Sequence, residues 1–152
     1  MGQTAEQFLQ VIGIRRRERD RRETEARLAH EAYETAEAEL ERARHAVDTA
    51  CRTCENAQRA RAASPCDTLV ADYVHAEHER LELCRQEAAS RAEMLAAAQR
   101  AVSAARFERQ RAQVRLDVLE TEHAAIRGRE RRRSERKREE AQPLLSALAS
   151  PC

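Results

Sequence analysis

Apolar residues recur along two long stretches of this sequence, at alternating spacings of three and four residues. In the first stretch the recurring positions are Ala5, Phe8, Ile12, Arg15, Arg19, Arg22, Ala26, Ala29, Tyr33, Ala36, Leu40, Ala43, Val47, Ala50, Cys54 and Ala57. In the second they are Val70, Val74, Glu77, Leu81, Cys84, Ala88, Arg91, Leu95, Ala98, Val102, Ala105, Arg109, Ala112, Leu116, Leu119, His123 and Ile126. Because these steps keep one helix face turned toward a partner, both stretches are predicted to be coiled-coil helices.

A proline near the middle of the chain separates the two stretches. Ser64 is a good helix N-cap residue, Pro65 is favoured at the first helical position, and Asp67 places an acid in the first turn. The sequence therefore predicts a short turn at residues 63–65 and the start of a second helix at about residue 65.

The outer ends of the helices are also marked by local signals. Thr4 and Gln7 form a capping-box pattern, which predicts that the first helix covers residues 4–62. Pro143 is expected to stop the second helix, which is predicted to run to about residue 140. The predicted organisation is a helical hairpin over residues 1–142 and a flexible tail over residues 143–152.

With so short a turn, the two helices must be antiparallel, and residues whose numbers sum to about 130 should lie level. Leu40 and Val47 then face residues 81–88. The predicted fold class is all-α, with two long helices forming an antiparallel coiled-coil hairpin. The arginines at 15, 19 and 22 fall opposite Arg109, so we expect the hairpin to loosen, bend or bind something at that level.

Composition supports a long-helix protein. The chain is 36% charged and 3% aromatic, so it cannot build a thick core. A disordered chain is the competing interpretation, but a formal net charge of +1 and the phased apolar residues argue against it. No stretch is apolar over the roughly 20 residues that span a bilayer, so membrane insertion is not expected. We expect a cytosolic protein whose five cysteines are reduced thiols.

Basic residues form two clusters, both near the end of the predicted hairpin that carries the termini. The clusters are Arg15, Arg16, Arg17, Arg19, Arg21 and Arg22, and Arg127, Arg129, Arg131, Arg132, Arg133, Arg136, Lys137 and Arg138. They are either a solvated face or a surface that docks onto an acidic partner. Nucleic acid is disfavoured as that partner because no aromatic residues interleave with the basic run.

An apolar patch follows the turn. Leu69 and Tyr73 are four residues apart and should line a stripe beside Val70 and Val74. The patch either packs locally across the turn or is exposed as an anchor for a protein partner.

Two pairs of possible metal ligands fall at facing levels of the hairpin. Cys51 with Cys54 and His75 with His78 could hold a zinc ion tetrahedrally. However, His75 falls on an outer position and no zinc-finger pattern is present, so no metal and no cofactor is expected. In the alternative, Cys54 is a small residue of the helix contact. No catalytic motif occurs either, and an enzymatic role is not expected.

The all-helical pattern, the helix start near Phe8, the central Pro65 and the arginine-rich end of the second helix resemble the central-stalk proteins of bacterial type III secretion systems. These are the YscO or SctO family, their Hrp-type counterparts and flagellar FliJ. The resemblance implies a cytoplasmic bacterial protein at the inner-membrane secretion apparatus. Its implied partners are a hexameric export ATPase, an export gate protein and secretion chaperones.

The resemblance also assigns roles by position. The end that faces the ATPase would be formed by Phe8, Ile12, Arg15, Arg19, Arg22, Leu119, Ile126, Arg129, Arg132 and Arg133. The end that faces the gate would be formed by Leu69, Tyr73 and Val74. Two alternatives remain open, namely a secretion chaperone or adaptor, and a basic coiled-coil scaffold that binds nucleic acid.

Overall fold

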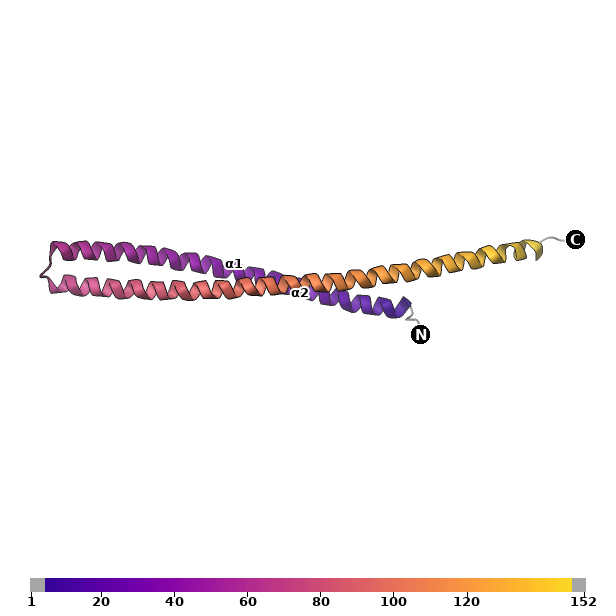
Figure 1. The fold of residues 1–152 in the computed structure, drawn as a ribbon, viewed down its shortest axis with the longest axis horizontal. Helices are drawn as coiled ribbons and strands as arrows, with labels where there is room; N and C mark the ends of the chain where they lie inside the picture. Colours follow the sequence, from indigo (N-terminus) through magenta and orange to yellow (C-terminus); the bar gives the residue numbers. More distant parts are fainter. Residues whose placement is uncertain (1–4, 149–152) are drawn as a thin grey trace. The chain divides into compact units, whose positions relative to one another are not determined.

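The computed structural model describes residues 5–148, with side chains described for residues 6–140, and contains two long helices. Helix α1 spans Ala5–Ala63 and helix α2 spans Thr68–Leu148, and they pack against each other (Figure 1). This confirms the predicted all-α helical hairpin. The chain divides into a turn unit, residues 25–106, and a terminal unit, which contains residues 5–24 and 107–148 among those described.

The turn occupies residues 64–67, slightly later than predicted. The Ser64 amide still donates to the Ala60 carbonyl at 3.0 Å, so Ser64 ends α1 instead of starting α2. Asp67 is the N-cap of α2, because its Oδ1 accepts the amides of Leu69 at 2.9 Å and Val70 at 3.4 Å. The predicted N-cap at Ser64 and helix start at residue 65 are therefore wrong. A carboxylate that accepts two free amides is the stronger start signal.

Replacing Asp67 with alanine should remove this cap. We expect Asp67→Ala to lower the free energy of unfolding by about 1 kcal/mol, the usual cost of losing an N-cap side chain. Chemical denaturation followed by circular dichroism measures the change. Asp72→Ala, one turn further along and also exposed, is the matched control and should have little effect. Equal losses in both variants would contradict the capping role.

The far end of α2 also differs from the prediction. The helix continues through Pro143 to Leu148, so the predicted stop before Pro143 is wrong. Proline removes one backbone hydrogen bond inside a helix, but Leu144, Leu145 and Leu148 are strong helix formers that favour continuing it. The rest of the predicted tail, residues 149–152, lies outside the described residues, as does the predicted cap at Thr4.

A single seam of small and aliphatic side chains joins the helices within each unit. Every described position of the two predicted stripes is buried or half-buried except Arg109, which is exposed. We call the two facing stripes the central seam. In the turn unit its buried cluster is Ala50, Cys54 and Leu81, with Val47, Cys51 and Cys84 packed against them. The contacts of Cys54 with His78 and of Glu39 with Arg91 join residues whose numbers sum to 132 and 130, which agrees with the predicted antiparallel register.

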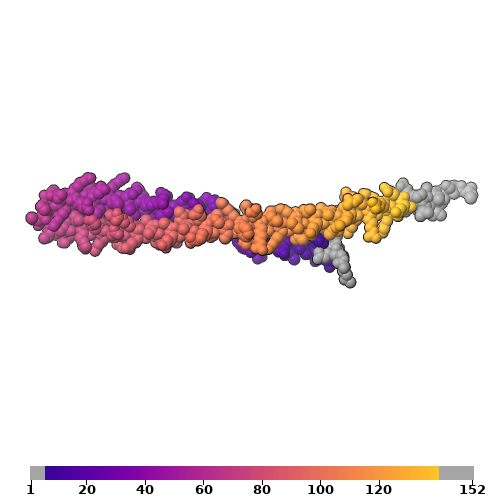
Figure 2. Space-filling model, in the orientation of Figure 1, coloured from indigo at the N-terminus to yellow at the C-terminus, as the bar shows by residue number. Residues whose placement is uncertain are grey.

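Small side chains make this seam narrow. Ala43, Ala50 and Ala57 are buried, although alanine contributes little apolar area. Figure 2 shows the consequence in the turn unit, where α1 and α2 lie in continuous contact. In the terminal unit the buried residues are Ile12, Ala112 and Leu116.

Candidate partner-binding surfaces

Ion pairs between the helices fill the arginine-rich break in the seam. Arg16 holds Glu120 through two nitrogens, at 2.7 and 3.0 Å, and Arg115 lies 3.6 Å from Glu18. Glu18 also pairs with Arg15. The terminal unit therefore joins its helices at this level by charge instead of apolar contact. The boundary between the two units falls just beyond this level, and the expectation that the hairpin loosens, bends or binds something here stays a prediction.

Glu18 is the acidic centre of this network. Its hydrogen bond with Arg15, and the positive charges of Arg15, Arg115 and Arg22, hold the pKa of the Glu18 carboxyl below its usual value. Further along, Arg109 lies 3.7 Å from Glu23 and Arg19 lies 2.8 Å from Asp20. Arg15, Arg19 and Arg22 are all half-buried. Arg15 and Arg19 are therefore engaged within the unit, which makes them poor candidates for contact with an external ring.

The basic cluster on α2 behaves differently. Residues 127–140 carry eight basic and four acidic side chains, a net charge of +4. All described side chains from Glu130 to Glu140 are exposed. None of the eight basic side chains forms a salt bridge within the described part of the chain. Arg129, Arg132 and Arg133 are thus the predicted site residues that remain available to an acidic partner.

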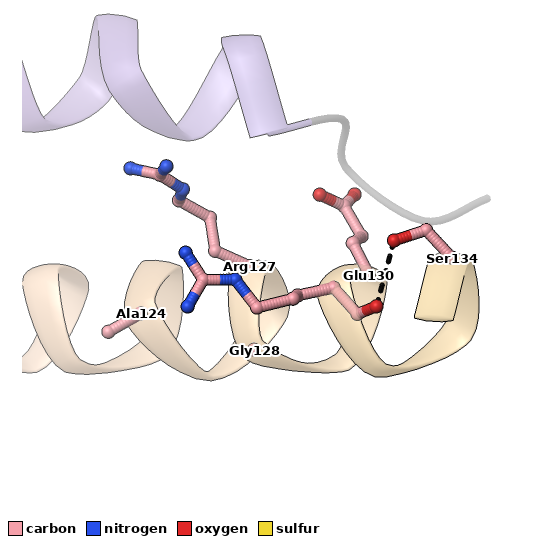
Figure 3. Close-up of a pocket in the computed structure, with 6 residues that line it drawn as sticks. Ala124, Arg127, Gly128, Glu130 and Ser134 are labelled. Carbon is pink, nitrogen blue, oxygen red and sulfur yellow. Dashed lines mark hydrogen bonds between the residues drawn. The ribbon is translucent and has the colours of Figure 1, made fainter. Parts of the chain in front are cut away.

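A groove opens on α2 at the start of this basic stretch (Figure 3). Gly128 lines this groove together with Arg127 and Arg131. The Ser134 hydroxyl donates to the Arg131 carbonyl at 2.8 Å. The remaining lining residues are Ala124 and Glu130. Two guanidinium groups beside a groove suit a carboxylate side chain of a protein partner.

The apolar residues assigned to the ATPase-facing end occupy a different environment. Ile12 is only 4% exposed, and Phe8, Leu119 and Ile126 are half-buried in the central seam. Ile12 is therefore a core residue, which argues against its predicted role as a partner contact. It belongs to the seam because it lies in phase with the stripe that faces α2. The exposed large apolar residues at this end include Leu9, Val11 and Ile14 on α1, and Val114 and Val118 on α2, all of which the seam pattern skipped.

The apolar patch after the turn is partly accessible. Leu69 is 76% exposed and Tyr73 is 47% exposed. Val74 is half-buried in the central seam. The first two are therefore available to a partner, whereas Val74 contributes mainly to packing between the helices.

The four possible metal ligands are not brought together. Cys54 Sγ lies 3.6 Å from His78 Nδ1, but that nitrogen is also 2.9 Å from the Val74 carbonyl oxygen. His75 is exposed and lies 3.3 Å from Glu79. No group of three or more potential ligands converges within the described residues. Cys54 instead belongs to the buried centre of the turn unit.

No other protein supplies an assignment for these surfaces. Over residues 5–148, neither helix has a stretch long and apolar enough to cross a bilayer. The surfaces with a distinct chemistry are the basic stretch of α2 and the exposed apolar side chains. Comparison with protein-family models, with curated proteins and with solved structures found no match to this chain.

Proposed function

We propose that this chain is a non-enzymatic stalk of a bacterial type III secretion apparatus that couples a hexameric export ATPase to the export gate. The observation that carries the proposal is the unpaired basic stretch of α2, residues 127–138, in a two-helix hairpin. Several basic side chains at other levels are held by neighbouring acids, as Arg16 is by Glu120, whereas residues 127–138 gather eight basic side chains in one stretch that makes no salt bridge among the described residues. A helix that leaves its cations unpaired at one end is suited to an acidic surface on another protein.

The hairpin would act mechanically. Within each unit the two helices are joined, by apolar packing in the turn unit and by apolar packing together with ion pairs in the terminal unit, so a force on one helix is carried by the other. The basic stretch would contact the ATPase, and Leu69 and Tyr73 in the turn unit would contact the gate. Because one hairpin has no sixfold symmetry, it would touch the six ATPase subunits unequally and relay their nucleotide-dependent changes to the gate.

Charge reversal at the basic stretch tests the ATPase contact. We expect Arg132→Glu combined with Arg133→Glu to weaken binding to the purified hexameric ATPase by at least about tenfold, because two attractions become repulsions. Binding is measured by biolayer interferometry at physiological salt, with circular dichroism to confirm that helix content is unchanged. Both side chains are exposed, so the fold should tolerate the change.

Arg100→Glu is the matched control. Arg100 is exposed in the turn unit and makes no salt bridge among the described residues, so its reversal changes the net charge without touching the proposed contact. It should leave ATPase affinity within about twofold of the original. Failure of the unaltered chain to bind the ATPase would refute the proposal. Steeply salt-dependent binding to duplex DNA or RNA, lost in the Arg132 and Arg133 variant, would point instead to a nucleic-acid scaffold.

A further inference from the structure

A second apolar stripe runs along the outer face of α2 in the turn unit. It begins with Leu69 and Tyr73 and continues with the same steps of four and three residues as the central seam. Its members are Leu69, Tyr73, Ala76, Arg80, Leu83, Glu87, Ser90, Met94, Ala97, Ala101 and Ala104. We call this set the outer stripe. From Leu69 to Ala97 it covers four heptads, which is long enough for a specific coiled-coil contact.

The outer stripe is open to solvent. Every one of its members is exposed, including Leu83 at 65% and Met94 at 52%. On the other flank of α2, the side chains at the same levels are mostly polar, as at His75, Glu82 and Arg85. The concentration of large apolar side chains on one flank, at coiled-coil spacing, indicates a surface that is complementary to another helix.

We propose that the outer stripe joins two copies of this chain, with the two α2 helices antiparallel and Leu83 near the twofold axis. Placing Leu83 level with Leu83 of the second copy pairs stripe residues whose numbers sum to 166 or 167. The remaining pairs are Arg80 with Glu87, Ala76 with Ser90, Tyr73 with Met94, and Leu69 with Ala97. The stripe is therefore complementary to itself in this direction.

Charge selects the antiparallel arrangement. Arg80 and Glu87 are the members of the outer stripe that are charged at neutral pH, and they lie on opposite sides of Leu83. In the antiparallel pair each arginine meets a glutamate of the other copy, twice by symmetry. In a parallel pair, arginine would meet arginine and glutamate would meet glutamate.

The two charged side chains are loosely held in the single chain. Arg80 is 4.0 Å from Glu77, and Glu87 is 3.7 Å from Arg91. Both Arg80 and Glu87 are more than 60% exposed, so they can turn toward a second copy. Tyr73 level with Met94 would add a contact between a thioether and an aromatic ring on each side of the axis.

Self-association would cover Leu69 and Tyr73. The paired form and a chain bound to another protein through these two residues would then exclude each other. The proposal itself does not depend on the stalk role, because the outer stripe acts on a second copy of the same chain.

Sedimentation equilibrium of the full chain over a range of concentrations tests the proposal. The unaltered chain should form a dimer. Arg80→Glu alone and Glu87→Arg alone should each weaken the dimer by about tenfold or more, since each places like charges together. The double variant, Arg80→Glu with Glu87→Arg, restores opposite charges and should recover most of the lost affinity.

Recovery of affinity in the double variant would show that Arg80 meets Glu87 of the second copy, and that the single variants do not act only by changing the net charge. Glu82→Arg is the matched control, because Glu82 is exposed on the opposite flank of α2 and pairs with Arg85 at 2.7 Å. It should leave the dimer unchanged. A chain that stays monomeric at all concentrations would overturn the proposal. So would a double variant no stronger than the single variants, or a Glu82→Arg variant weakened as much as they are.

Discussion

Replacing Leu40 with proline is expected to disrupt the turn unit and to abolish secretion in a system that depends on this chain. Leu40 is 5% exposed in the central seam, midway along α1. Proline removes a helix hydrogen bond and its ring clashes with the preceding turn, which costs about 3 kcal/mol or more. The lost burial of a leucine adds about 2 to 5 kcal/mol. A seam in which about a third of the positions are alanine has little stability in reserve to offset such a loss.

The change is measured by circular dichroism and thermal unfolding of the purified variant, and the effect on the proposed stalk role is measured by a secretion assay. Thr68→Pro is the matched control, since Thr68 is the first residue of α2 and proline is favoured there. It should keep the helix content and unfolding temperature close to those of the unaltered chain. A Leu40→Pro protein with normal helix content and normal unfolding would show that α1 does not need to be continuous.

A second large effect is expected from Leu116→Ala in the terminal unit. Leu116 is 3% exposed and is one of the few large side chains buried there. Its truncation should lower the free energy of unfolding of this unit by about 2 to 5 kcal/mol, because transfer and cavity terms add. Hydrogen exchange read by mass spectrometry should show faster exchange in residues 5–24 and 107–126, and little change in residues 25–106.

Val118→Ala provides the comparison for Leu116→Ala. Val118 lies two residues further along the same helix but is exposed, so its truncation should cost less than about 1 kcal/mol. If the two variants exchange alike, Leu116 does not anchor the terminal unit. Loss of protection over the whole chain in Leu116→Ala would instead mean that the two units unfold as one.

Periodicity was sufficient to predict most of the fold. The steps of three and four residues identified the seam in both helices, because burial in a two-helix structure follows this spacing and little else. The one exposed seam position, Arg109, is a residue whose charge favours solvent and whose partner, Glu23, lies beside the stripe. The turn was predicted a few residues too early because Ser64 and Asp67 are both good N-cap residues. Only the hydrogen bonds of the backbone show that Asp67 is the one that caps α2.

The candidate sites were less predictable than the fold. The sequence does not reveal whether a basic residue forms an ion pair with an acid on the other helix. Arg16 forms such a pair with Glu120, whereas Arg132 is exposed and forms none among the described residues. Apolar residues at one end were assigned to a partner, yet Ile12 faces α2 because of its phase on the helix. The outer stripe could have been found from the sequence by testing the same spacing on a second face, which starts at Leu69.

The ion pair between Glu39 and Arg91, with nitrogen and oxygen 2.6 Å apart, has a consequence for how the helices find their alignment. Alanine presents nearly the same surface at every turn, so a contact made of alanines would fit almost as well after sliding by one heptad. Sliding would separate the two half-buried charges and leave Arg91 only the more distant Glu87, at 3.7 Å on its own helix. The ion pair between Glu39 and Arg91 thus favours one register of α1 against α2.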